Sequence, residues 1–285
     1  NLRSEHVKLK FTKMQGCGND YVYVNCFEEA VADRPKLARF VTNRNFGIGS
    51  DGLICICPSD VADFKMDMYN IDGSSSQMCG NGIRCVGKYV YDKGMTESTR
   101  ITVESGGSVR TLDLNVEDGK VKTVRVDMGS PELRPQYIPL AERGRNFINR
   151  PVIVGDEEYF LTALSVGNPH AVVFVSDVEE IDIGVIGPKF EKHPLFPERV
   201  NTEFVQIIDE NTLKMRVWER GCGETLACGT GATASLVAAA LCGHTGNSAT
   251  VRLLGGELFI EWNRESNKLY MTGPAVTVFD GELYI

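Results

Sequence analysis

The sequence predicts an α+β fold that consists of two similar halves, each with many strands and one main helix. Three observations lead to this prediction. Segments resemble one another at a constant spacing, short apolar strand-like segments occur in both halves, and in each half a Cys-Gly pair precedes the main helix. Strands that are grouped together, rather than alternating one by one with helices, are typical of α+β proteins.

The internal repeat is the first of these observations. The segment "QMCGNGIRC" contains Cys79 and "LACGTGATA" contains Cys228, which lies 149 positions later (228 − 79). The same offset relates Asn70 to Glu219, Gly18-Asn19 to Gly167-Asn168, and Gly106-Gly107 to Gly255-Gly256. Four separated landmarks at one spacing indicate a duplicated unit that has since diverged.

The predicted elements follow the same order in each half. Short alternating segments predict strands at 21–25 and 170–175, and again at 64–69 and 213–218. The apolar run "GLICIC" at 52–57 predicts a buried strand, with its cysteines as core thiols. After the glycine turn and the cysteine we expect helices at 82–93 and 231–242, with Cys85 in the core, and then further strands.

The repeat also sets the predicted domains. The first half ends near residue 126, so we expect an N-terminal domain at 1–126 and a C-terminal domain at 127–273. The last strand, "AVTVFDGELYI", follows Gly273-Pro274. We expect the segment 274–285 to return to the N-terminal domain and complete it.

Composition and charge exclude several classes of protein. The net charge of −8 and the lack of a long basic run argue against a nucleic-acid partner. Mean hydropathy is −0.14 and no apolar run approaches the roughly 18 residues of a membrane span. The first residues lack the apolar region of a signal peptide. We therefore expect a cytoplasmic protein that does not bind membranes.

The nine cysteines are an odd number, which argues against a disulfide framework in a chain without an export signal. The chain has no C-x-x-C pair and only four histidines, so we expect no metal site. It also lacks the G-x-x-x-x-G-K-[ST] and G-x-G-x-x-G patterns of nucleotide-binding loops.

Cys79 and Cys228 are the candidate reactive groups. Each precedes a predicted helix N-terminus, where unpaired N–H groups and the helix dipole favour negative charge. We therefore expect a lowered thiol pKa. The neighbouring amides could also hold a substrate carboxylate. These amides belong to Gly80, Asn81, Gly229 and Thr230.

Two opposed thiols on either side of a carboxylate-bearing carbon suit one reaction. A thiolate removes the α-proton, the other thiol returns a proton to the opposite face, and the stereocentre inverts. The amides would stabilise the charge that develops on the carboxylate. Two structural thiols in the core and a binding-only protein with the same cleft remain alternatives at this point.

Further polar residues lie at strand ends or in turns near these motifs. Arg220 is a candidate carboxylate clamp because its guanidinium binds bidentately, and Glu219 could bind an ammonium group. Such a set suggests a substrate with more than one charged end. The other candidates are Asn19, Asn70, Asn168, His170 and Asn201.

These motifs make the chain resemble diaminopimelate epimerase over nearly its whole length. The segments that resemble the family are "GCGND" at 16–20, "YNIDGSSSQMCGNGIRC", "SVGNPH", "FPERVN" and "VWERGCGETLACGTGA". The resemblance implies interconversion of LL- and meso-2,6-diaminopimelate in lysine and peptidoglycan precursor biosynthesis, without pyridoxal phosphate or metal. It implies that Cys79 and Cys228 are the two acid–base residues, with Cys228 as acceptor and Cys79 as donor in the LL-to-meso direction.

The resemblance also implies roles for the other site residues. His170 and Glu219 would tune the thiols, the four amides would hold the reacting carboxylate, and Asn19 would hold the reacting amino group. The distal end of the substrate would bind Asn70, Asn168, Asn201, Glu219 and Arg220. Some members of the family carry Gln where this chain has Gly52, so a side-chain contact to substrate is lost there and the backbone of Gly52 takes its place.

The fold that the resemblance implies has two pseudo-symmetric domains. Each is a curved, mostly antiparallel sheet wrapped around a central helix, and the active site lies in the cleft between them. A homodimer in the cytoplasm, or in the plastid stroma of a plant, is implied as well. The nearest alternatives are a two-cysteine proline or hydroxyproline racemase, against which Glu219 and Arg220 argue, and a single-base isomerase of the phenazine-biosynthesis type, against which both cysteines argue.

Overall fold

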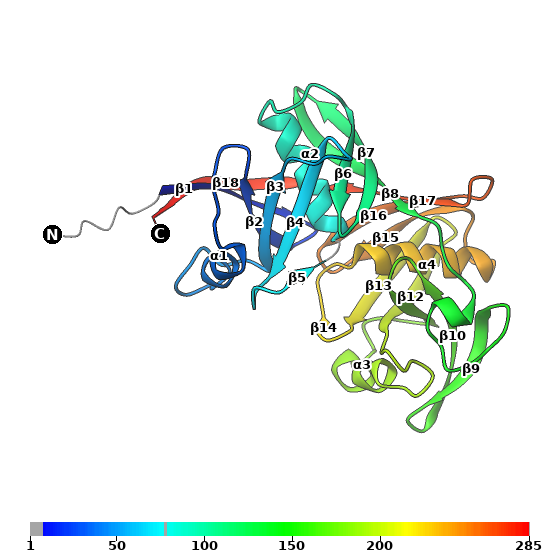
Figure 1. Cartoon of the computed structure of the whole chain (residues 1–285). Coiled ribbons are helices and arrows are strands. Elements are labelled where there is room, and N and C mark those ends of the chain that lie inside the picture. The colour runs from blue at the N-terminus through cyan, green and yellow to red at the C-terminus, as the bar shows by residue number, and fades with distance from the viewer. Residues whose placement is uncertain (1–7, 77–78, 285) are drawn as a thin grey trace. The chain divides into compact units, whose positions relative to one another are not determined.

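The computed structural model describes residues 8–76 and 79–284 (Figure 1). Its contacts divide the chain into two units. Unit 1 extends to Val126 and resumes at Pro274, and unit 2 comprises Asp127–Gly273. Each unit is a mixed α+β structure. Among the described residues, no helix combines the length and the apolar character that a membrane crossing needs.

The described residues of unit 1 form a run of paired strands, the long helix α2 and the short helix α1. Its strands pair in the order β18-β1-β2-β3-β4-β6-β7-β8, with β5 beside β4, and only β2–β3 and β4–β6 are parallel. The elements are β1 (Lys8–Gly16), β2 (Asn19–Asn25), α1 (Arg34–Val41), β3 (Gly52–Cys57), β4 (Phe64–Asn70), β5 (Ser75–Ser76), α2 (Gly80–Asp92), β6 (Arg100–Ser105), β7 (Ser108–Glu117), β8 (Lys120–Gly129) and β18 (Val276–Tyr284).

Unit 2 repeats this arrangement. Its strands pair in the order β9-β10-β11-β12-β13-β15-β16-β17, with β14 beside β13 and with β11–β12 and β13–β15 parallel. The elements are η1 (Pro135–Tyr137), β9 (Phe147–Val154), β10 (Glu157–Ser165), β11 (Pro169–Val175), α3 (Ile183–Glu191), β12 (Asn201–Asp209), β13 (Thr212–Glu219), β14 (Gly223–Glu224), α4 (Gly229–Leu241), β15 (Ser248–Leu253), β16 (Gly256–Asn263) and β17 (Lys268–Pro274).

The long helix of each unit is enclosed by its sheet. Helix α4 contacts β10, β11, β12, β13, β15 and β16, and α2 contacts β1, β2, β7 and β18. Small residues allow the helices to pack closely against the strands. At Gly87 of α2, the side chains of Leu112 and Leu114 already fill the space that a side chain would need. The alanines of α4 are nearly all buried. The predicted mostly antiparallel sheet around a central helix is confirmed in both units. Strand β3 ("GLICIC") is buried along its whole length, as predicted.

Both predicted central helices are confirmed, but each begins two residues earlier than expected. Helix α2 begins at Gly80 and α4 at Gly229 because Cys79 and Cys228 are the N-cap residues. Each cysteine has extended backbone angles, and its sulfur accepts the N–H of the third helical residue. A thiol thus fills the place that Ser, Thr or Asp usually takes at a helix start.

The last strand lies in unit 1. Strand β18 pairs antiparallel with β1, with Leu9 opposite Leu283, and Figure 1 shows the red strand running beside the blue one. In unit 2 the corresponding edge of β10 is covered by β9, which precedes it in sequence. The two units therefore share one strand order. They differ in the origin of the edge strand: in unit 1 it is the last strand of the chain, β18, and in unit 2 it is β9, which directly precedes its partner β10.

Candidate active site

Cys79 forms the centre of the first candidate half-site, in unit 1. Its Sγ accepts the backbone N–H of Gly82 at 3.3 Å and the hydroxyl of Tyr21 at 3.4 Å. The thiol in turn donates to Oδ1 of Asn19 at 3.2 Å. Asn19 begins β2 and is held by its side-chain N–H bond to Asp51 at 2.8 Å. Gln77 and Met78 of this cysteine motif lie outside the described residues.

Arg84 supports this half-site from inside the unit. Its side chain is fully buried, and it donates to the carbonyls of Gly80 and Pro274, both at 3.1 Å. It thereby ties the first turn of α2 to Pro274, the residue at which the chain returns to unit 1. Its positive charge also lowers the pKa of Cys79, although by less than burial raises it.

Cys228 forms the second half-site, in unit 2. Its Sγ accepts the backbone N–H of Gly231 at 3.3 Å and lies 3.5 Å from the hydroxyl of Thr230. The side chain is only 6% exposed. Burial raises its pKa well above the usual value, and the nearby carboxylates of Glu219 and Glu203 raise it further.

The expectation of a lowered thiol pKa is therefore wrong for the free protein. Burial raises the pKa of both Cys79 and Cys228, because a thiolate loses more hydration on burial than its few hydrogen bonds return. The helix N–H groups work in the expected direction, as do Tyr21 and Arg84 at Cys79. The charged neighbours act in opposite directions at the two thiols: Glu219 and Glu203 raise the pKa of Cys228, whereas Arg84 lowers that of Cys79.

His170 of unit 2 is hydrogen-bonded through both of its ring nitrogens. Its Nδ1 is 2.7 Å from Oε1 of Glu203 and its Nε2 is 2.9 Å from Oδ1 of Asn168, so both ring nitrogens are engaged. His170 and Glu203 are both fully buried. Burial raises the pKa of Glu203, and His170 offsets part of this rise. Oε2 of Glu203 has no hydrogen-bond partner among the described residues, which adds to the cost of its charge.

Three further predicted binding residues, Asn201, Glu219 and Arg220, lie at the start of β12, at the end of β13 and directly after β13. Asn201 begins β12 beside His170, and its Oδ1 accepts the backbone N–H of Arg220 at 2.7 Å. The guanidinium of Arg220 donates to the carbonyl of Glu198 at 3.0 Å. Glu219 accepts the hydroxyl of Thr225, and burial raises its pKa. Together with His170 and Asn168, these residues gather at one end of the sheet of unit 2.

Asn70 and Gly52 hold the matching places in unit 1, where they are paired across β3 and β4. Asn70 is exposed and donates to the hydroxyl of Ser74 at 3.0 Å. Gly52 is closely packed: a Cβ there would lie 2.6 Å from the Tyr69 carbonyl and 2.7 Å from the Tyr21 ring. The residues around Gly52 therefore exclude a longer side chain at this position.

Sequence reasoning missed Tyr21 and Glu203, although the 149-residue spacing relates both to residues of interest. Tyr21 corresponds to His170, and Glu203 corresponds to Ile54 in the buried strand "GLICIC". An acidic residue at a position whose counterpart lies in a buried strand is a signal of function, because burying an unpaired carboxylate is costly.

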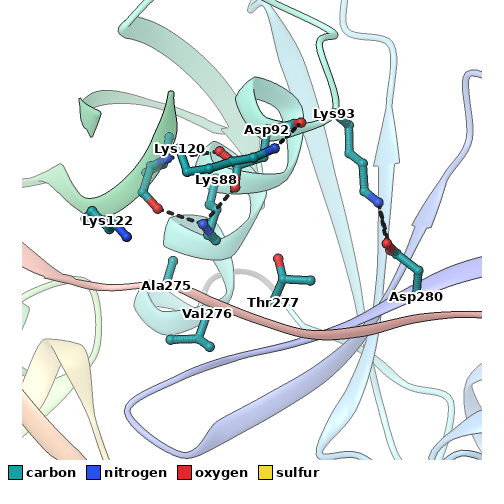
Figure 2. A pocket seen from close by; sticks show the side chains of 10 residues that line it. Lys88, Asp92, Lys93, Lys120, Lys122, Ala275, Val276, Thr277 and Asp280 are labelled. Atoms are coloured by element: carbon teal, nitrogen blue, oxygen red, sulfur yellow. Dashed lines mark hydrogen bonds and ion pairs between the residues drawn. The ribbon is translucent and has the colours of Figure 1, made fainter. Parts of the chain in front are cut away.

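A cavity of 490 Å³ lies elsewhere in unit 1, near the end of α2 (Figure 2). It contains neither Cys79 nor Cys228. Its lysines are largely neutralised within the wall: Lys88 pairs with Asp92 and Lys93 with Asp280, both at 2.7 Å. The thiol chemistry therefore belongs to the two half-sites and not to this cavity.

The comparison with protein families matches the chain to the diaminopimelate epimerase family over residues 11–134 and 162–278. A diaminopimelate epimerase of Acetivibrio thermocellus is 58% identical to this chain over 275 residues, which cover 96% of this chain and 98% of that protein. The two matched ranges of the family contain the positions of Cys79 and Cys228.

Solved structures share the fold at much lower identity. A phenazine biosynthesis protein of the PhzF family from Bacillus anthracis matches with a TM-score of 0.72 at 14% identity, covering 98% of this chain and all of that one. A probable proline racemase from Agrobacterium radiobacter matches with a TM-score of 0.72 at 15% identity, covering 97% and 93%. These matches concern the fold alone.

Proposed function

Because the chain belongs to the diaminopimelate epimerase family, we propose that it interconverts LL- and meso-2,6-diaminopimelate by two-base proton transfer. One cysteine thiolate takes the proton of an α-carbon, and the other thiol delivers a proton to the opposite face. The observation that carries this proposal is the equivalence of Cys79 and Cys228. Each is an N-cap whose sulfur lies 3.3 Å from the amide N of the third helical residue.

The first turns of α2 and α4 would hold the reacting carboxylate. The first N–H groups of a helix have no carbonyl partner within it, and they carry the positive end of the helix dipole. The residues concerned are Gly80 and Asn81 in α2, and Gly229 and Thr230 in α4. Negative charge grows on the carboxylate as the α-proton leaves, so these donors would bind the transition state more strongly than the substrate.

Polar residues around the two thiols would fix the rest of the substrate. Asn19 bonds to Cys79, and its side-chain oxygen would accept a hydrogen bond from the reacting ammonium group. The distal ammonium and carboxylate would bind the group formed by Asn70, Asn168, Asn201, Glu219 and Arg220. Arg220 has to exchange its contact with the Glu198 carbonyl for a substrate carboxylate. A charged pair remote from the reacting carbon suits diaminopimelate and has no counterpart in proline.

The different surroundings of the two thiols decide which ionises first. Glu219 and Glu203 raise the pKa of Cys228, whereas Tyr21, Arg84 and amide groups lower that of Cys79, so we expect Cys79 to be the first to lose its proton in the free protein. Cys228 takes the proton from the LL isomer, so Cys79 takes the proton in the reverse direction. The protein with ionised Cys79 is therefore the form that reacts with the meso isomer. An ammonium group of the substrate near Glu219 would reduce the bias against ionised Cys228.

The test uses a panel of substrates and two variants. The wild type, Cys79→Ala and Cys228→Ala are incubated under reducing conditions with LL-diaminopimelate, L-proline and trans-4-hydroxy-L-proline, and products are separated on a chiral column. Conversion of diaminopimelate alone, lost in both variants and retained after dialysis against EDTA, supports a metal-independent epimerase. Conversion of proline would favour the racemase alternative, and an active single-cysteine variant would overturn the two-base mechanism.

We further propose a cytoplasmic or plastid homodimer. No disulfide joins cysteines within the part of the chain that the structure describes, which suits a reducing compartment. Edge strand β18 exposes Val276, Val278, Phe279 and Tyr284, and an exposed apolar edge favours association with a second copy. Val278→Lys should lower the molar mass measured by light scattering to that of one chain, whereas the similarly exposed Val185→Lys on α3 should leave it unchanged. Equal masses would contradict this interface.

A further inference from the structure

The internal repeat places Tyr21 where the second half-site has His170. The two residues are 149 positions apart, and each is paired in parallel register with the first residue of the next strand. Tyr21 pairs with Gly52 on β3, and His170 pairs with Asn201 on β12. The two side chains therefore leave equivalent strands at equivalent places beside equivalent cysteines.

The contacts of the two residues differ. His170 bonds to Glu203, whereas Tyr21 bonds directly to Cys79, with its hydroxyl 3.4 Å from the sulfur. The position equivalent to Glu203 is occupied by Ile54, which cannot accept a hydrogen bond. Tyr21 is therefore the polar side chain that replaces the His170–Glu203 pair in the first half-site.

The ring of Tyr21 is held firmly in this orientation. It is only 7% exposed, and it stacks edge-on to Tyr23 at a centroid distance of 6.4 Å. Gly52 leaves the space that the ring fills, since a Cβ there would lie 2.7 Å from Cε1 of Tyr21. Burial raises the pKa of Tyr21 well above its usual value, so the hydroxyl keeps its proton and acts as a donor towards the sulfur.

We propose that Tyr21 is a positioning residue that stabilises the thiolate of Cys79 through its hydroxyl, and that Gly52 is required to admit its ring. The proposal rests on the proposed two-base function of Cys79. A hydrogen bond to a thiolate is stronger than one to a thiol, so the Tyr21 hydroxyl favours ionisation. The Asn19 carbonyl oxygen accepts the thiol proton and favours the neutral form. Cys79 thus has one partner for each protonation state that the cycle requires.

The experiment compares Tyr21→Phe with Tyr23→Phe. Both remove one buried hydroxyl from the same strand, but the Tyr23 hydroxyl bonds to the Gly82 carbonyl at 3.1 Å and not to Cys79. The rate of iodoacetamide modification at each cysteine is followed against pH by peptide mass spectrometry. Cys228 in the same molecule is the internal reference. Near-ultraviolet circular dichroism establishes that each variant is folded.

Tyr21→Phe should raise the midpoint of Cys79 modification by about one pH unit, which is about a tenfold loss of rate below the midpoint. The midpoint of Cys228 should stay in place, and Tyr23→Phe should leave Cys79 within about 0.3 unit. The pH at which epimerisation through ionised Cys79 begins should rise by the same amount. Folded Tyr21→Phe with an unchanged Cys79 midpoint would overturn the proposal.

The modification assay needs no substrate, so it separates two kinds of failure. If the Cys79 midpoint moves but the wild type does not epimerise diaminopimelate, the hydroxyl–thiol coupling stands and the proposed function fails. If the wild type is active and the midpoint does not move, the role of Tyr21 fails alone.

Discussion

His170 and Glu203 form a fully buried pair, with Nδ1 and Oε1 2.7 Å apart, beside Cys228. The carboxylate of this pair raises the pKa of Cys228, so Glu203→Gln should lower it while keeping a hydrogen-bond partner for the ring. The modification midpoint of Cys228 should fall and that of Cys79 in the same molecule should not. A Cys228 midpoint that stays or rises would show that the carboxylate has no electrostatic effect on this thiol.

Glu219→Gln should also lower the pKa of Cys228, because the negative charge of Glu219 raises that pKa more than the charge of Glu203 does. Glu219 is also a proposed ligand of the distal ammonium, so this variant should raise KM for diaminopimelate, whereas Glu203→Gln should mainly change the pH profile. Steady-state kinetics at several pH values separate the two effects. Equal changes in KM for both variants would contradict the assignment of Glu219 to the substrate.

The packing of Gly52 gives a prediction about stability. Gly52→Ala places a methyl group against the Tyr69 carbonyl and the Tyr21 ring, and overpacking of this kind costs about 1–3 kcal/mol. Gly246→Ala is the matched control, since nothing lies within 4 Å of a Cβ at that position between α4 and β15. Thermal unfolding should show a clear fall in midpoint for the first variant and almost none for the second. Equal midpoints would mean that the Tyr21 ring moves aside at little cost.

How much of this site the sequence predicted depends on how local each interaction is. Cys79 and Cys228 were found because a cysteine, a glycine turn and a helix are adjacent along the chain, and the repeat doubled the signal. Tyr21 and Glu203 were not found. Their contacts depend on the parallel pairing of β2 with β3 and of β11 with β12, which joins segments about 30 residues apart in a register that no local pattern encodes.

The pKa values of the two thiols were also only partly predictable from the sequence. The helix N-terminus was visible in the sequence and acts in the predicted direction, but the depth of burial was not visible and has the larger effect. The requirement for Gly52 was hidden for a related reason, because it arises from the ring of Tyr21 on a neighbouring strand.

Burial of thiols and phenols predicts a loss of stability in alkali. Folding raises the pKa of Cys79 and Cys228, and it raises the pKa of Cys85 to about 11. The native state therefore binds these protons more tightly than the unfolded chain. Their contribution to stability is fully present below the ordinary thiol pKa and is lost as pH rises through the folded values.

The thermal midpoint should accordingly fall as pH rises above about 9, the range in which unfolded thiols ionise. Differential scanning calorimetry in matched buffers at low ionic strength measures this. Cys85→Ala should have a shallower decline, because one raised pKa is removed. A midpoint that is constant or rises over the alkaline range would contradict the burial of these thiols.

The most direct test of the two-thiol account is the position of solvent deuterium after one turnover. LL-diaminopimelate is incubated in D₂O with reduced wild-type protein, and the meso product and the remaining LL substrate are analysed at low conversion. Proton transfer by Cys79 and Cys228 on opposite faces predicts one deuterium at the inverted α-carbon of the product and almost none in the recovered substrate. Deuterium appearing equally in substrate and product, or product that retains the substrate's own α-proton, would contradict the two-base mechanism.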